Sequence, residues 1–165
     1  MKKNILKRTI TSIVCAVLLL SLAACGSESG GSSAGTAHVD GTLSEIFKKI
    51  YDNADVESPM VMEVVVDDTN KASMIGTDSV AFIEGLASEA AIMTIPHSMV
   101  LLRVAKDADV ESIKKLIKDN VDPRKWICVG VDPDQVIVDS IGDLVFLVMS
   151  ANAEAYHNSF LKLAE

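Results

Sequence analysis

One adjacent pair of residues in the second half of the chain combines a base with a nucleophile. The segment PHSM places His97 directly beside Ser98, which sets a base next to a hydroxyl. Both residues begin HSMVLLRVA, whose apolar composition predicts a strand, and adjacent side chains of a strand point to opposite faces. The two side chains therefore cannot hydrogen-bond as a catalytic dyad. Because no third partner is identifiable, we expect neither residue to be catalytic.

Cys128 lies in DPRKWICVG, close to the single tryptophan, Trp126. Two interpretations are open. If KWICVGV is a central strand, Cys128 shares a face with Trp126 and behaves as a small buried hydrophobe of low reactivity. A reactive thiol would need an exposed electropositive setting, which Arg124 or Lys125 could supply. We favour the buried, inert interpretation.

Acidic residues recur at alternating positions in DADVES, as they do at the start of a calcium loop. The sixth position of such a loop needs glycine and the twelfth needs glutamate, but these positions hold Ser112 and Lys118. Helix capping explains Asp107, Asp109 and Glu111 at least as well. The chain also has no Walker-type glycine loop, dinucleotide fingerprint or zinc-ligand spacing. We therefore expect no metal and no cofactor.

The first 24 residues have the layout of an export signal. Four basic residues among the first eight precede an apolar run over 10–24, which is short for a spanning helix of about 20 residues. The run ends in LAAC, the pattern that a bacterial lipoprotein signal peptidase accepts. We expect 1–24 to be removed and the thiol of Cys25 to carry diacylglycerol. The alternative is a plain cleaved signal with an incidental cysteine. With Cys15 removed in the signal and Cys25 occupied by lipid, Cys128 has no intrachain cysteine partner, so we expect no disulfide.

Residues 25–41 form the next segment, and after the cysteine they read GSESGGSSAGTAHVDG. Glycine and serine at this density form flexible coil with a mean reach of about 20–25 Å. The stretch GSSAG matches the nucleophile-elbow pattern G-x-S-x-G, but neither a strand nor a helix flanks it. We interpret 25–41, which includes His38, as a tether.

Removal of the signal also changes the charge of the chain. It takes away four basic and no acidic residues, so the formal net charge falls from −8 to −12. So acidic a chain repels nucleic acid and anionic lipid surfaces alike. We expect no nucleic-acid partner and expect attachment to the outer face of the cell membrane through acyl chains, such as palmitate, on Cys25.

Residues 42–165 have the length of one small domain. Thr42 and Glu45 form a capping box at the start of a helix, and Met60–Val66 predicts a strand. A short helix capped at Asp68 and ended by Gly76 follows. The segment 78–96 is ambiguous, with a short strand around Phe82 and then a turn or short helix. HSMVLLRVA is the next strand.

The best helical pattern is DADVESIKKLIKDNV, with Asp109 as N-cap and an apolar stripe at Val110, Ile113, Leu116 and Ile117. KWICVGV, QVIVD and LVFLVMS predict three strands, the last two joined by a hairpin turn at Gly142. A final helix begins near residue 151 and carries His157 toward solvent. The sequence therefore predicts an α+β fold: one small domain with a mainly antiparallel sheet of about five strands and three main helices packed on it.

The sequence of the expected domain resembles a known protein family. The block SEAAIMTIPHSMVLLRVAKDADVESIKKLIKDNVDPRKWICVGVDPDQVIVDSIGDLVFLVM is similar to small Gram-positive bacterial lipoproteins of domain-of-unknown-function family 4358. The likeness covers about residues 43–149, and HSMVLLRV, DPRKWICVGV and SIGDLV are its most specific parts. The family has no assigned activity, so the resemblance implies location and architecture but no catalytic residues.

Three functional classes remain. We favour a non-enzymatic, membrane-anchored lipoprotein that binds an envelope protein or a small ligand. A cell-envelope enzyme is the second class, for which no adequate residue constellation is visible. A solute-capturing lipoprotein ranks last, because the usual two-lobed solute binders need about twice this length.

Overall fold

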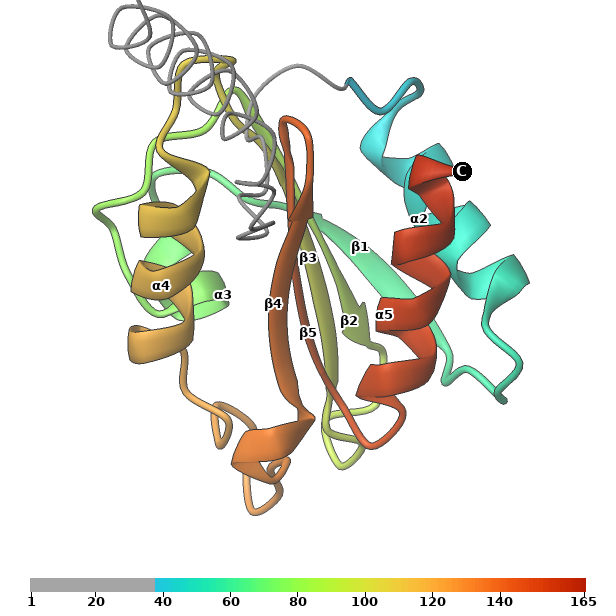
Figure 1. The fold of residues 1–165 in the computed structure, drawn as a ribbon. Helices are drawn as coiled ribbons and strands as arrows, with labels where there is room; N and C mark the ends of the chain where they lie inside the picture. The colour runs from blue at the N-terminus through green and yellow to red at the C-terminus, as the bar shows by residue number, and fades with distance from the viewer. Residues whose placement is uncertain (1–37) are drawn as a thin grey trace, which may run out of the picture. The chain divides into compact units, whose positions relative to one another are not determined.

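The computed structural model describes residues 38–165. They form a five-stranded sheet covered by helices on both faces (Figure 1), which confirms the predicted α+β class. The helices are α2 (Leu43–Asn53), α3 (Lys71–Ile75), α4 (Val110–Asn120) and α5 (Ala153–Leu161), with 3₁₀ turns η1 (Pro133–Gln135) and η2 (Lys162–Ala164). The strands are β1 (Val61–Val65), β2 (Glu84–Ala90), β3 (His97–Arg103), β4 (Val136–Ile141) and β5 (Leu144–Ser150).

The sheet has the strand order β1-β2-β3-β5-β4, and every neighbouring pair is antiparallel. Every residue of β3 and β5 is buried, because these central strands are covered on both faces. Helices α2 and α5 pack on one face, around Phe146 and Phe160. Helix α4 and the short α3 cover the other face, around Val100 and Leu147. Strands β1 and β4 are the two edges of the sheet.

The starts of α2 and α4 follow the predicted capping. The Thr42 and Glu45 side chains make the reciprocal capping box of α2, and the Asp109 carboxylate accepts from the Ser112 N–H at the start of α4. Of the predicted apolar stripe of α4, Val110 and Ile117 are buried, whereas Leu116 is 39% exposed. Among residues 38–165, no helix is both long and apolar enough to cross a bilayer.

The β4–β5 hairpin is confirmed, with Ile141 paired to Leu144 and Gly142 at φ +56°. Gly76 also ends α3 as predicted, at φ +80°. The start of α3 is not capped by Asp68. Instead, the Asp67 carboxylate accepts from the Thr69 N–H, and the helix begins two residues later.

The ambiguous segment contains a full strand. β2 runs from Glu84 to Ala90, beginning two residues after Phe82, and residues 91–96 form turns without a helix. Its composition, EGLASEA, favours a helix locally, but pairing on both sides with β1 and β3 satisfies its backbone as a strand.

The predicted strand KWICVGV is wrong, because residues 122–131 form a closed loop. The Asp122 carboxylate accepts from the Arg124 N–H at 2.8 Å, which bends the chain into a turn. The Val131 N–H donates to the Pro123 carbonyl at 2.9 Å and closes the loop. Cys128 has φ +65°, which no β-strand accommodates.

Candidate functional site

His97 and Ser98 lie on opposite faces of β3, as their spacing predicts, and both are buried because each face is covered. The ring of His97 joins a chain of polar side chains under α2 and α5. Its Nε2 lies 2.8 Å from the Tyr51 hydroxyl, which is 2.8 Å from Ser88 Oγ, and its Nδ1 lies 3.1 Å from Ser150 Oγ. A neutral imidazole has one donor nitrogen and one acceptor nitrogen. It can therefore hydrogen-bond to Tyr51 and Ser150 at the same time, whichever of the two nitrogens carries the proton.

The environment of the chain keeps His97 uncharged. Burial lowers the pKa of His97 to about 4, and burial likewise raises the pKa of Tyr51 far above its ordinary value. The ring of Tyr156 stands edge-on to both residues. A cavity of about 570 Å³ adjoins His97 and Ser150. Because both ring nitrogens are already bonded, His97 is a structural residue of the core.

Ser98 belongs to a separate cluster on the α3/α4 face. Its hydroxyl donates to Glu89 at 2.6 Å, and the Lys125 ammonium lies 2.9 Å from Glu89 and 3.0 Å from Ser98 Oγ. The side chains of Glu89 and Lys125 are each only 15% exposed. The carboxylate accepts from both partners, so this cluster satisfies its own charges and ties the 122–131 loop to the sheet.

Cys128 is exposed, so the buried interpretation is wrong. The loop turns the thiol outward while Trp126 packs against the core and Lys125 turns to Glu89. The electropositive setting is therefore only partly available to the thiol, because Lys125 is paired. The other predicted modification site, Cys25, lies outside the described residues.

The acidic candidates do not converge. Asp109 caps α4, and Glu111 pairs with Lys114 at 3.0 Å. Within residues 38–165, no group of three or more histidine, cysteine, aspartate or glutamate side chains could hold a metal ion.

His157 does not face solvent freely. Its Nε2 lies 2.8 Å from Asp139 on edge strand β4, and Lys114 of α4 approaches the same carboxylate at 3.3 Å. Burial raises the pKa of Asp139, but the bonds from His157, from the Ser140 N–H and from Lys114 together outweigh this effect, so the pKa lies below its ordinary value. One carboxylate therefore links the helix layers on the two faces of the sheet.

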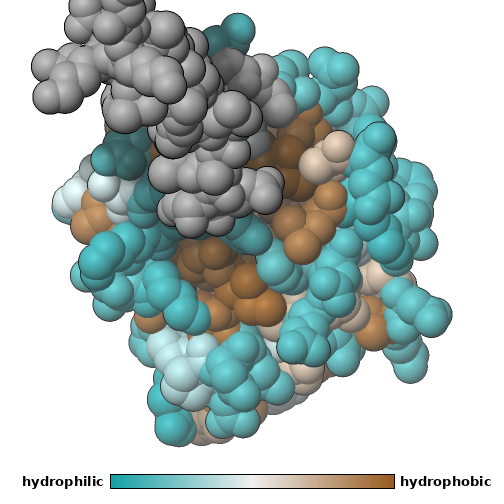
Figure 2. Space-filling view, viewed as in Figure 1, coloured by the Kyte–Doolittle hydropathy of each residue, from teal (hydrophilic) through white to brown (hydrophobic). Residues whose placement is uncertain are grey.

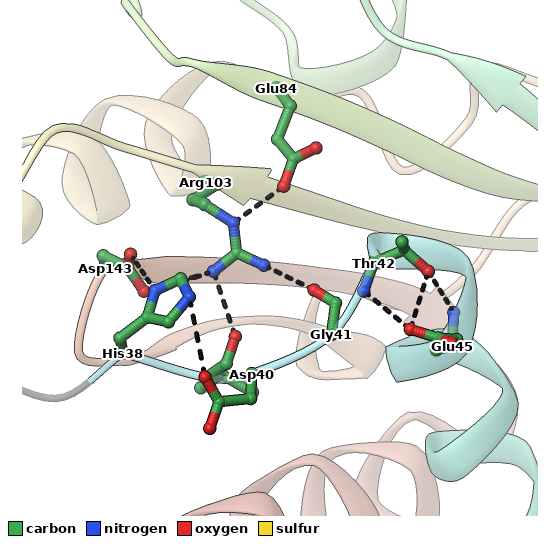
Figure 3. Close-up of polar contacts among 9 residues, drawn as sticks. His38, Asp40, Gly41, Thr42, Glu45, Glu84, Arg103 and Asp143 are labelled. Carbon is green, nitrogen blue, oxygen red and sulfur yellow. Dashed lines mark hydrogen bonds and ion pairs between the residues drawn. The ribbon is translucent and has the colours of Figure 1, made fainter.

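Arg103 was not anticipated as a site residue, although a charged residue that ends an apolar strand is a signal for one. Its Nε donates to Glu84 at 2.7 Å, and its Nη1 lies 3.4 Å from Asp143 in the hairpin turn (Figure 3). The same guanidinium donates to the main-chain carbonyls of Val39 and Gly41, at 3.1 and 3.0 Å. Its side chain is 9% exposed.

These contacts place the start of the folded domain before residue 42. Val39 is buried in the core, and His38 Nδ1 lies 2.8 Å from Asp143 (Figure 3). The last residues of the expected tether, 38–41, are therefore part of the domain and are held by Arg103.

A groove of about 860 Å³ lies beside this cluster, between the start of α2, the end of β1 and the segment 78–86. Five carboxylates line it, those of Glu63, Asp67, Asp68, Asp78 and Glu84, against one ammonium, that of Lys71. Lys71 pairs with Asp68 at 2.7 Å, and Glu84 pairs with Arg103. The remaining three carboxylates have no cationic partner among residues 38–165.

Apolar side chains are exposed next to these carboxylates. Val65 is 66% exposed and Ile83 is 69% exposed, and both line the groove. Met60 and Met62 on the same edge of the sheet are 76% and 55% exposed. Apolar side chains exposed together beside a polar rim are a feature of interaction surfaces.

The backbone of β1 is open along the same edge. The pairing with β2 uses the even-numbered positions, as shown by the bonds from Ala91 N–H to the Met60 carbonyl and from Val66 N–H to the Gly85 carbonyl. The N–H and C=O groups of Val61 and Glu63 therefore point away from β2. Within the described part of the chain, no hydrogen bond uses them.

The other edge of the sheet, formed by β4, is flanked by helices. Figure 2, seen past edge strand β4, shows hydrophilic residues over α4 and α5 with apolar residues between them. At this edge β4 is flanked by both helices, and Lys118 donates to the Val136 carbonyl. Of the two sheet edges, β1 is therefore the one that neither α4 nor α5 flanks.

No family model, no curated protein and no solved structure matches this chain.

Proposed function

We propose that this protein is an extracytoplasmic lipoprotein, anchored to the outer face of the membrane through Cys25, whose domain is a non-enzymatic module that binds another envelope protein. The observation that supports binding is the open edge of β1, where unpaired backbone groups, exposed apolar side chains and unpaired carboxylates occur together. An exposed edge strand of this kind is a template for another polypeptide.

The polar clusters favour binding over catalysis. His97 is held by Tyr51 and Ser150, whereas Ser98 is held by Glu89 and Lys125 on the other face. The Ser98 hydroxyl and the His97 imidazole therefore do not form a nucleophile–base pair. A cell-envelope enzyme is therefore the weaker alternative, and a solute-capturing lipoprotein the weakest. We also propose that the domain is related to the lipoproteins of domain-of-unknown-function family 4358, which its sequence resembles.

The anchor is tested by metabolic labelling of cells with a clickable fatty acid. We expect wild-type protein to be labelled and the Cys25→Ala variant to be unlabelled, with Cys128→Ala as a matched control that keeps the label. Continued labelling of Cys25→Ala would contradict lipidation at this residue.

Binding is tested by placing a photo-crosslinking amino acid at Val65 in the full chain and irradiating intact cells. We expect one discrete protein adduct, reduced in the presence of Glu63→Lys, and no such adduct from the same crosslinker at exposed Glu154 on α5. Equal adducts from both positions would contradict a specific binding edge. A co-purifying small molecule without a protein adduct would favour solute capture.

A further inference from the structure

The partner of the β1 edge can be specified by chemistry, on the basis of the proposed binding function. We propose that the edge accepts an extended segment of another protein that adds to β1 as an antiparallel sixth strand and carries a lysine or arginine opposite Glu63.

The backbone of β1 sets the geometry of this addition. The N–H and C=O groups of Val61 and Glu63 point outward, and so does the N–H of Val65. The Val65 carbonyl accepts from Asn70 Nδ2 at 2.8 Å, so the open stretch ends there. The stretch is therefore long enough for about five residues of an added strand. The rest of the sheet is antiparallel, and antiparallel pairing is slightly more stable per residue.

The side chains of β1 set the sequence preference. Val61, Glu63 and Val65 alternate along the strand and share the α2/α5 face of the sheet. Residues directly opposite one another in an antiparallel pair lie about 4.5–5.5 Å apart at Cβ. The expected segment thus has apolar residues opposite both valines and a basic residue between them.

The charge of the surroundings strengthens this preference. Glu63 is exposed and bonds only to the Ser44 hydroxyl, at 2.8 Å, among the described residues. Asp67 and Asp78 line the same groove without cationic partners in residues 38–165. A basic side chain in the added strand would therefore lie in a field of several carboxylates.

The same charges argue against a second copy of this chain as the occupant. Pairing of β1 with another β1 would bring Glu63 and its acidic neighbours together across the new ladder. Like charges opposite one another destabilise a strand pair, and the chain carries a formal net charge of −8. The occupant is therefore a different polypeptide, of basic and apolar character.

The test uses the purified full chain in detergent and a fluorescent peptide with the central segment Val-Thr-Lys-Thr-Val, measured by anisotropy. We expect binding to the wild type, and about five- to tenfold weaker binding when the central lysine is glutamate. The Glu63→Lys variant should reverse this preference, while Glu154→Lys, with the same charge change on α5, should leave it unaltered. Equal affinity of both peptides would overturn the basic preference.

Backbone methylation decides between strand addition and nonspecific charge attraction. Methylation of the central lysine nitrogen, whose N–H faces β1 in this register, should weaken binding at least about tenfold. Methylation of a neighbouring threonine nitrogen, whose N–H points away, should have little effect. Equal effects would overturn strand addition. A Val65 adduct in cells together with no discrimination among peptides would overturn this inference alone. Absence of the adduct would contradict the proposed binding function itself.

Discussion

The ammonium of Lys125 lies 2.9 Å from a carboxylate oxygen of Glu89, in a setting where each side chain is 15% exposed. This ion pair joins the 122–131 loop to β2, and the Ser98 hydroxyl bonds to both partners. Loss of either charge leaves the other poorly solvated.

We expect Lys125→Met to lower the free energy of unfolding by about 1–3 kcal/mol, because it strands the charge of Glu89. Lys106→Met, at an exposed lysine without an ion pair among the described residues, should be neutral within about 0.5 kcal/mol. Urea denaturation of the full chain measures both. Recovery of stability in the Lys125→Met, Glu89→Gln double variant would show that the stranded charge is the cause.

Cys128 should react with a thiol reagent in the folded protein without denaturant, because its side chain is exposed in the 122–131 loop. The measurement is the rate of labelling under native conditions, with Cys128→Ser as the blank. Labelling that appears only in denaturant would contradict the loop. Since the thiol is not packed, Cys128→Ser should change the unfolding free energy by less than about 0.5 kcal/mol.

The buried, neutral state of His97 predicts a pH dependence of stability. Its pKa is about 4 in the folded protein and about 6.5 when unfolded, so between these values only the unfolded state binds the proton. The free energy of unfolding should therefore have its full value above pH 6.5. It should fall by about 3 kcal/mol as the pH is lowered to 4. Denaturation between pH 6.5 and 5 isolates this effect from carboxylate titration. A flatter slope is expected for His97→Asn, and an unchanged slope would contradict the assignment.

Arg103 should control the attachment of residues 38–41 to the domain. We expect Arg103→Met to destabilise the protein by about 3 kcal/mol, because it leaves Asp143 without its guanidinium and frees the carbonyls of Val39 and Gly41. Hydrogen exchange of peptides covering 38–50 should accelerate. The exposed Arg124→Met variant is the control, and equal exchange in both variants would contradict the role of Arg103.

Gly142→Val should lower the free energy of unfolding by about 2 kcal/mol, because a β-branched residue is strained at φ +56°. The substitution also threatens the register of β4 and β5, in which Ile141 pairs with Leu144. Asp134→Ala, in the exposed η1 turn, should be nearly neutral, within about 0.5 kcal/mol. Thermal melts of the two variants compare them, and a wild-type melt for Gly142→Val would contradict the turn.

Local signals in the sequence determined much of the fold. The capping box at Thr42, the cap at Asp109 and the glycine turn at Gly142 depend on residues within a few positions of each other, so they could be predicted from the sequence. The opposite orientation of His97 and Ser98 follows from strand alternation alone.

Other features were decided only by the tertiary structure, because they depend on partners far apart in the chain. Helix-favouring EGLASEA becomes β2 because β1 and β3 pair with it on both sides. KWICVGV has the composition of a strand, yet Lys125 finds Glu89 across 36 positions and the loop closes around that contact. The Arg103 cluster and the open β1 edge likewise arise from strand order, which no local pattern encodes.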